Sequence, residues 1–230
     1  MSVHGGPNII EDGLVLCLDA ANPKSYPGSG TTWFDLSRNK NNGTLVNGVN
    51  YDDSSGSMTF DGVNDYVSLT STDLRFGGLN SFTFDFFIKS PHSTNNQTIF
   101  SNGNVTTPGN GIWFFKRRSG LDNKLTFHGY STNPRIDLVS TNIIPDNIFC
   151  AVSLTFNGID TYNVFINGQL ENTISTNPIA SATGNSFIGS TGGTGSFFSS
   201  NVYSSKIYNK ALSLSEIQQN FNATRGRYGI

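Results

Sequence analysis

The sequence predicts an all-β protein with polar turns and one short helix near its end, on three observations. Only 13% of the 230 residues are charged, about half of the roughly 25% that is usual in globular domains. The 18 Phe and 8 Tyr side chains suit pleated strands. Apolar residues recur with a period of two from end to end, separated by clusters of Gly, Asn and Pro. These features exclude a coiled coil or a helical bundle, and the aromatic content is too high for a disordered chain.

The first expected strands are short apolar runs. They cover residues 14–18, then 58–60 and 67–69 on either side of a turn, and then 82–88. In the last of these runs, the apolar residues at even positions share one face of the strand, and Phe87 breaks the polar face opposite.

The clearest pattern is a meander of three strands, expected at 152–156, 162–166 and 170–174. An Asn-Gly pair follows the first strand at 157–158, and another follows the second at 167–168. Because Asn and Gly tolerate the positive φ of tight turns, the three strands are expected to run antiparallel, with one dry and one wet face.

One helix is expected near the end of the chain. Residues 213–216, Ser-Leu-Ser-Glu, have the spacing of a capping box, in which the Ser and Glu side chains satisfy free backbone N–H groups. Leu214, Ile217 and Phe221 follow at helical spacing, and Gly226 is a plausible end. The pattern predicts an amphipathic helix of about nine residues, which tertiary packing must stabilise.

Charge and targeting features exclude several classes of function. The formal charge of −2 lacks the positive excess of a nucleic-acid binder, and no apolar stretch is long enough to cross a bilayer. Residues 1–7 lack the basic and apolar blocks of a secretory signal. We therefore expect a protein that stays in a reducing cytosol or leaves the cell by another route, such as inside an assembled particle. Cys17 and Cys150 lie in apolar runs, which favours two buried thiols over a disulfide.

Seven segments appear in a characteristic order, at residues 13–16, 33–37, 42–45, 60–67, 82–84, 165–168 and 207–213. Together they resemble a laminin-G-like, concanavalin-A-like lectin domain. The resemblance covers residues 13–221 and implies a single domain over residues 1–230. The implied fold is a two-sheet antiparallel jelly-roll sandwich with one concave sheet, neighbouring termini and the short C-terminal helix.

Such domains are mostly adhesion and glycan-binding modules, with one branch of β-glucan hydrolases. Retaining hydrolysis needs two carboxyl groups about 5 Å apart, and the hydrolases place them on one strand as Glu-x-Asp-x-Glu. Here Glu11, Glu171 and Glu216 are scattered, with no Asp in that register. The three histidines are also far apart, and neither cysteine has an activating neighbour. The sequence therefore predicts no enzymatic activity.

Calcium is the one cofactor that the sequence leaves open. Asp61, Asn64 and Asp65 cluster at a turn, and Asp19 and Asp35 lie in loops that could converge on them. The alternative is that the three clustered residues only close the turn through side-chain to backbone hydrogen bonds.

The resemblance gives a further test, because pentraxin relatives hold calcium with acidic side chains in two loops. The corresponding stretches here, 90–97 and 189–195, contain no Asp or Glu. This argues against a calcium site of that type.

A glycan site would use an aromatic face, and Trp113, Phe115 and Tyr130 are the candidates. Residues 112–115 are apolar on both faces of a strand, so one face could be open to a sugar. The alternative is that both faces are buried, one in the core and one under a loop or a neighbouring subunit. The basic run at 116–118 is interpreted as a solvated hairpin tip.

We expect a non-enzymatic structural or adhesive component of a bacteriophage virion, such as a capsid decoration, tail or fibre protein. This rests on the stretch 19–31 and the Asn-Phe-Asn-Ala at 220–223, which resemble structural proteins of tailed bacteriophages. The expected partners are other virion proteins and cell-surface glycans, with a homo-oligomer left open, and the expected location is the virion, assembled in the host cytoplasm. The alternative is a secreted or surface carbohydrate-binding module of a bacterium.

Overall fold

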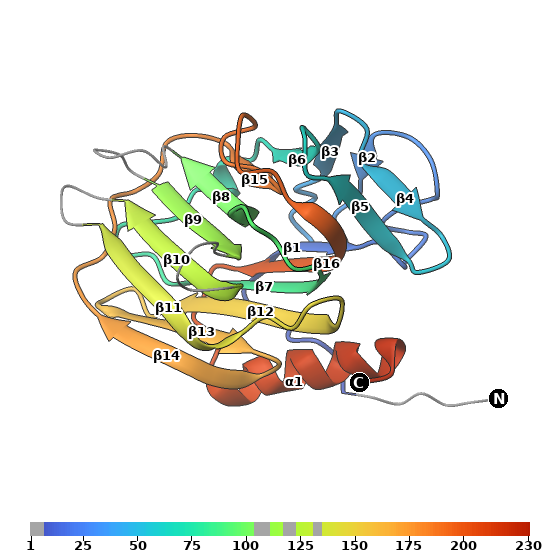
Figure 1. Ribbon diagram of the computed structural model, residues 1–230. Helices are drawn as coiled ribbons and strands as arrows, with labels where there is room; N and C mark the ends of the chain where they lie inside the picture. Colours follow the sequence, from blue (N-terminus) through green and yellow to red (C-terminus); the bar gives the residue numbers. More distant parts are fainter. Residues whose placement is uncertain (1–6, 104–110, 117–122, 131–134) are drawn as a thin grey trace.

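Two stacked antiparallel sheets of eight strands each form the body of the protein, and one helix lies against the first sheet (Figure 1). The computed structural model describes residues 7–103, 111–116, 123–130 and 135–230. The expected all-β jelly-roll sandwich with one short C-terminal helix is therefore confirmed.

The first sheet has the order β14-β13-β12-β7-β16-β5-β4, with β1 paired to β16. The second sheet has the order β11-β10-β9-β8-β15-β6-β3-β2. The strands are β1 (Leu14–Asp19), β2 (Thr32–Trp33), β3 (Gly43–Val46), β4 (Asn50–Asp52), β5 (Ser57–Asp61), β6 (Tyr66–Leu69), β7 (Phe82–Lys89), β8 (Gln97–Gly103), β9 (Gly111–Lys116), β10 (Lys124–Tyr130), β11 (Ile136–Ile143), β12 (Phe149–Phe156), β13 (Thr161–Ile166), β14 (Gln169–Ser175), β15 (Ser186–Ile188) and β16 (Ser199–Tyr208).

Aromatic side chains fill the space between the two sheets. Phe82, Phe84 and Phe86 alternate along β7 and are fully buried, as their period of two predicted. The ring of Phe84 lies 4.5 Å from that of Phe100 on β8, so the two layers are in direct contact. Phe87, on the opposite face of β7, is also buried, because it packs in a second aromatic cluster outside the sandwich.

The meander is confirmed as β12, β13 and β14, but its two connections differ. Asn167-Gly168 is a two-residue turn with both φ values positive, as expected. The first connection is longer and spans residues 157–160, because the Asn157 side chain accepts N–H bonds from the three residues 159–161. The Asn157-Gly158 pair lies in the connection, as expected, with Gly158 at a positive φ, and the turn includes two further residues.

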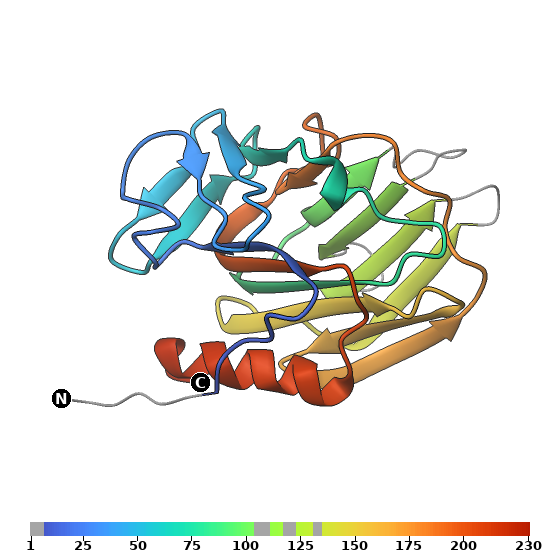
Figure 2. The same cartoon turned by 180° about the vertical axis from the view of Figure 1, so that it is seen from behind.

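The helix α1 (Leu214–Arg225) begins with the predicted capping box and ends at Gly226. It has 12 residues rather than about nine, because its last turns also pack on the first sheet through the buried side chains of Asn220 and Thr224. The start of the chain runs past the helix (Figure 2), and Gln219 Nε2 donates to the backbone oxygen of Asn8 at 2.8 Å. The two ends of the fold therefore lie together, as expected.

Two further expectations concern the cysteines and membranes. Cys17 and Cys150 are buried and free, which confirms the buried thiols. In the described part of the chain, no helix is long and apolar enough to span a bilayer.

Candidate functional site

The three predicted aromatic residues do meet, on the outer face of the second sheet. Trp113 and Phe115 alternate along β9 with core residues, and their rings stack at 3.9 Å. His128 on β10 lies opposite Trp113 and meets both rings edge-on, at 5.5 and 4.7 Å. Tyr130 follows on the same face, with its ring 6.1 Å from that of His128.

Burial limits what this aromatic cluster can contact. Phe115 is fully buried and Tyr130 is 5% exposed, whereas Trp113 remains partly exposed. The Trp113 indole donates its Nε1–H to Thr98 Oγ1 at 2.9 Å, which fixes the ring. Of the three predicted residues, only Trp113 therefore offers surface to a ligand in this structure, with Phe115 packed against it.

A polar network borders the aromatic cluster, and the sequence did not suggest it. His128 Nε2 lies 2.9 Å from Asp137 Oδ1, and Arg135 holds the same carboxylate with two bonds of 2.8 and 3.0 Å. Burial raises the pKa of Tyr130, and the Arg135 charge opposes this. The alternation of side chains along the strand 124–130 predicts that His128 and Tyr130 share a face. No sequence pattern near them indicates Arg135 or Asp137.

The proposed calcium residues around the 61–65 turn bond the backbone instead. Asp61 Oδ1 accepts the N–H groups of Val63 and Asn64 at 2.7 and 3.2 Å, and Asp65 Oδ2 accepts that of Asp61 at 3.0 Å. The N–H bond from Val63 is the main reason that the pKa of Asp61 is lowered. Asn64 also takes part through its backbone oxygen, which accepts the amide of Asn47.

Asp19 and Asp35 do not converge on this turn. Asp19 forms an ion pair with Arg227 at 2.8 Å, and Asp35 accepts N–H bonds from β1 and from its own loop. Over the described ranges, no group of three or more His, Cys, Asp or Glu residues could hold a metal ion. The turn residues thus follow the alternative that the sequence left open, in which side-chain to backbone hydrogen bonds close the turn, and Asp19 and Asp35 are engaged elsewhere.

A polar groove of about 840 Å³ opens on the surface of the described part of the molecule. One wall is the loop between β7 and β8, residues 91–97, and the other walls are the Asp61-Gly62 turn and the segment 196–199. The groove therefore lies where the turn after β5, the loop between β7 and β8 and the segment that leads into β16 meet. Its residues are Asp61, Gly62, Pro91, His92, Ser93, Thr94, Asn95, Asn96, Gln97, Ser196, Phe197 and Ser199.

The chemistry of the groove suits a ligand with many hydroxyl groups. Its lining is mostly hydroxyl and amide side chains, which both donate and accept, with the partly exposed ring of Phe197 as an apolar surface. Gln97 is only 4% exposed, and its Oε1 has no hydrogen-bond partner among the described residues. Asp61 supplies the one carboxylate of the lining, so the groove lacks the pair of acids that glycoside hydrolysis requires.

A buried lysine fixes the wall 91–97 from behind. Lys116 is fully buried, and its Nζ donates to Ser90 Oγ at 2.9 Å and to the Pro91 oxygen at 2.7 Å. Asp146 lies 3.4 Å from the same Nζ and 3.3 Å from His92 Nδ1. Burial is the main cause of the lowered pKa of Lys116, and Asp146 opposes it. The prediction of a solvated hairpin tip is therefore wrong for Lys116, which is buried. Residues 117–118 lie outside the described residues.

The other candidate acids are engaged in structural roles. Glu171 bonds the backbone and side-chain nitrogens of Asn142, at 2.7 and 3.2 Å. Glu216 caps α1 and pairs with Lys210. Neither of them faces a second carboxylate in the groove.

These features define a concanavalin-A-like jelly-roll domain with a polar groove at its rim. The chain belongs to the concanavalin A-like lectin/glucanases superfamily, whose laminin-G-type family model matches residues 60–218. No curated protein sequence matches the chain.

Solved structures share the fold at low sequence identity. Domain 4 of the extracellular arabinanase AbnA from Geobacillus stearothermophilus, in complex with arabinotriose, is 16% identical, with a TM-score of 0.64 over 93% of this chain and 100% of that one. The binding domain of Paraclostridial Mosquitocidal Protein 1 is 17% identical, with a TM-score of 0.61 over 93% and 52%. Trypanosoma rangeli sialidase in complex with sialic acid is 16% identical, with a TM-score of 0.65 over 94% and 33%. The chain thus spans about half of the toxin domain and a third of the sialidase.

Proposed function

We propose that this chain is a non-catalytic carbohydrate-binding domain and that the polar groove holds the sugar. The observation that carries the proposal is the lining of the groove, in which hydroxyl and amide side chains surround the partly exposed Phe197. Saccharides are recognised by such a combination, because their hydroxyl groups need donors and acceptors while their C–H faces pack on an aromatic ring.

The fold comparisons support the proposal without identifying a ligand. The arabinanase domain matches this chain over its whole length and was solved with arabinotriose. A domain of this size and fold can therefore be a sugar-binding unit. At 16% identity the likeness shows only a shared fold, so the proposal of sugar binding rests on the groove residues of this chain.

A glycan array with the purified chain tests the proposal, followed by calorimetry on any positive glycan. Phe197→Ala should weaken binding by about tenfold, which corresponds to roughly 1.4 kcal/mol of lost contact. Phe187→Ala is the matched control, because Phe187 is also a partly exposed phenylalanine but packs on Tyr66, outside the groove.

The outcomes separate the two candidate surfaces. Loss of binding in Phe197→Ala alone supports the groove. Loss in Trp113→Ala alone transfers the site to the aromatic face of the second sheet. Absence of binding by the wild-type chain to every glycan, with and without calcium, contradicts the proposed function, and release of reducing sugar contradicts its non-catalytic part.

We propose further that the domain acts on a bacteriophage particle as a structural or adhesive component. The support is the resemblance of residues 19–31 and 220–223 to tailed-phage proteins, together with a surface that carries few charges. Mass spectrometry of purified particles tests this, because a virion component is present at a fixed copy number. Absence from particles, together with an export system among the neighbouring genes, would favour a secreted or surface module of a bacterium instead.

A further inference from the structure

Three polar side chains are buried together between the first sheet and α1. Lys206 on β16 and Asp85 on β7 face each other across paired strands, and Asn220 on the helix bonds Asp85. Their exposed fractions are 5%, 4% and 1%. Burying an ion pair costs desolvation energy, which the attraction between the two charges often does not recover. A stabilising effect therefore does not by itself explain why this pair is present.

The two nitrogen-bearing groups share one oxygen of Asp85. Asp85 Oδ2 lies 3.5 Å from Lys206 Nζ and 3.2 Å from Asn220 Nδ2, while its Oδ1 accepts the Ser153 hydroxyl at 2.9 Å. Lys206 is otherwise weakly held: among the described residues, its other hydrogen bond is to Ser204 Oγ at 3.4 Å. A loosely held amine and an amide are thus both bound to a single carboxylate.

The hydrogen bonds of the Asn220 side-chain amide favour attack by a nucleophile on its carbon Cγ. Its Oδ1 accepts the backbone N–H of Ile10 at 2.9 Å, and its Nδ2 bonds the Tyr208 hydroxyl at 2.9 Å as well as Asp85. A fixed N–H donor on an amide oxygen stabilises negative charge that develops there. Tyr208 and the neighbouring Phe165 are buried, which excludes water from the cluster.

We propose that Lys206 and Asn220 condense to form an isopeptide bond that joins β16 to α1. Asp85 takes a proton from the Lys206 ammonium, and the freed electron pair of Nζ attacks Cγ of Asn220. The Ile10 N–H holds the oxyanion on Oδ1. Asp85 passes its proton to the leaving Nδ2 and takes one from Nζ, the Cγ–Nδ2 bond breaks, and ammonia leaves. The reaction needs no oxidant, reductant or further reactant.

The cross-link would fix the one helix of the fold to the middle of the first sheet. That helix has 12 residues and depends on tertiary packing, so it would otherwise be among the first parts to detach. A covalent bond at Asn220 removes this route of opening. The inference does not depend on glycan binding, and its test is independent of any ligand.

The wild-type chain itself provides the first measurement. Its denatured mass should be lower than the sequence mass by about 17 Da, the mass of the released ammonia. In a tryptic digest, the free peptide 211–225 should be absent and should appear joined to the peptide that ends at Lys210, with cleavage after Lys206 blocked. A full sequence mass and a free 211–225 peptide would overturn the proposal.

Variants of Asp85 and Lys206 test the role of each side chain, and the position of the mass loss distinguishes the cross-link from another modification. Asp85→Asn keeps the size of the side chain but cannot exchange the protons, so it should restore the full mass in a folded protein, as should Lys206→Met. Circular dichroism shows whether these variants fold, and the wild-type peptide map decides the matter if they do not. A loss of about 17 Da that maps to an Asn-Gly pair is a succinimide and contradicts the cross-link.

Discussion

Asp35 offers the sharpest test of how this fold uses its carboxylates. Its side chain is 9% exposed and accepts three backbone N–H groups, from Cys17, Ser37 and Asn41, at 2.7, 2.8 and 2.7 Å. It also accepts the Ser37 hydroxyl at 2.6 Å. These bonds join the loop after β2 to the middle of β1, so we expect Asp35→Ala to destabilise the whole domain.

The expected loss of stability follows from the backbone N–H groups that lose their acceptor in Asp35→Ala. Each buried N–H left without an acceptor costs about 1–3 kcal/mol, and water entering the gap recovers part of this. Three such groups give a loss of about 4 kcal/mol, which lowers the melting temperature of a domain of this size by about 12 °C. Asp35→Asn keeps one acceptor oxygen and should lose about half as much.

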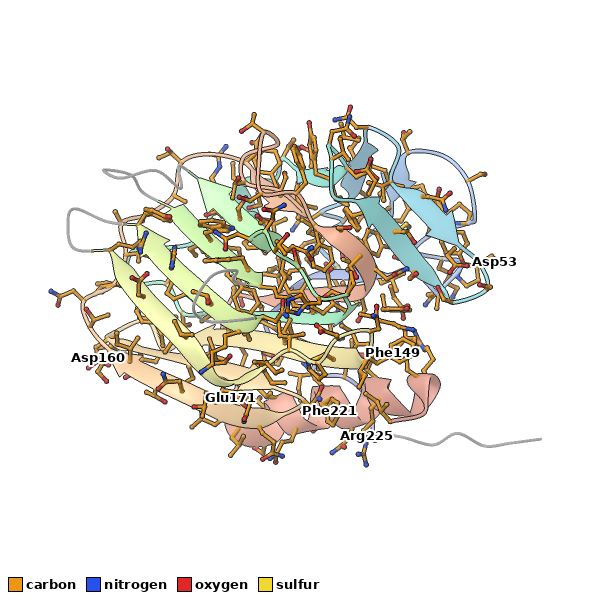
Figure 3. The ribbon with its side chains drawn as sticks, viewed as in Figure 1. Asp53, Phe149, Asp160, Glu171, Phe221 and Arg225 are labelled. Atoms are coloured by element: carbon orange, nitrogen blue, oxygen red, sulfur yellow. The ribbon has the colours of Figure 1, made fainter. Side chains whose placement is uncertain are left out.

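Guanidinium titration followed by far-UV circular dichroism measures the free energy of unfolding. Asp53→Ala is the matched control, because Asp53 is exposed at the edge of the molecule (Figure 3) and its hydrogen bond with Tyr51 is long, at 3.4 Å. We expect this control to change stability by less than about 0.5 kcal/mol. A loss below about 1 kcal/mol in Asp35→Ala, or a wild-type midpoint that calcium raises and chelator lowers, would refute the capping role.

Three further predictions follow from buried or capped groups. Lys116→Met should speed hydrogen exchange in residues 91–97 relative to residues 152–156, because the groove wall loses its two short hydrogen bonds to Lys116. Mass spectrometry measures the exchange, and unchanged rates in residues 91–97 of the variant would contradict the anchoring role of Lys116. The pKa of Glu216 lies below its ordinary value of 4.5, mainly through the backbone N–H of the helix cap, so its contribution to stability is present above pH 4.5 and lost as the pH falls through the lower folded value. Glu216→Gln should therefore be less stable than wild type at pH 7 in thermal melts, and the difference should disappear in acid. Burial raises the pKa of Cys17 to about 11 and that of Cys150 to about 12, so Ellman's reagent should find no reactive thiol in the native protein and both in guanidinium.

Local patterns explain which parts of the fold could be predicted. The capping box at 213–216 and the Asn-Gly turn at 167–168 are complete within four residues, so sequence alone was sufficient for both. The period of two along 82–88 likewise identified the core face of β7. The turn at Asn157 was predicted, but its bonding was not, because an asparagine side chain can also close a longer loop and the sequence does not choose between these uses.

The candidate site could not be predicted in this way, because it is assembled from distant segments. The groove brings residues 61–62, 91–97 and 196–199 together, and only the pairing of β8 and β16 with their neighbours decides this. Lys116 shows the same limit. The sequence pattern of a basic run predicts a solvated tip, whereas the structure places two acceptors around the ammonium group of Lys116.

Side chains connect the two sheets at the β11 and β14 edges of the sandwich. β11 and β14 are the end strands of the two sheets, and unpaired end strands readily add a strand from another chain. Here side chains bridge the two edges. Thr141 Oγ1 donates to the Glu171 backbone oxygen at 2.6 Å, and Asn172 Nδ2 donates to that of Val139 at 2.9 Å. The side chain of Glu171, which is labelled in Figure 3, in turn accepts the Asn142 N–H at 2.7 Å. A homo-oligomer of this chain should therefore form through another surface, and Glu171→Ala, which frees the edge of β11, should increase aggregation at high protein concentration.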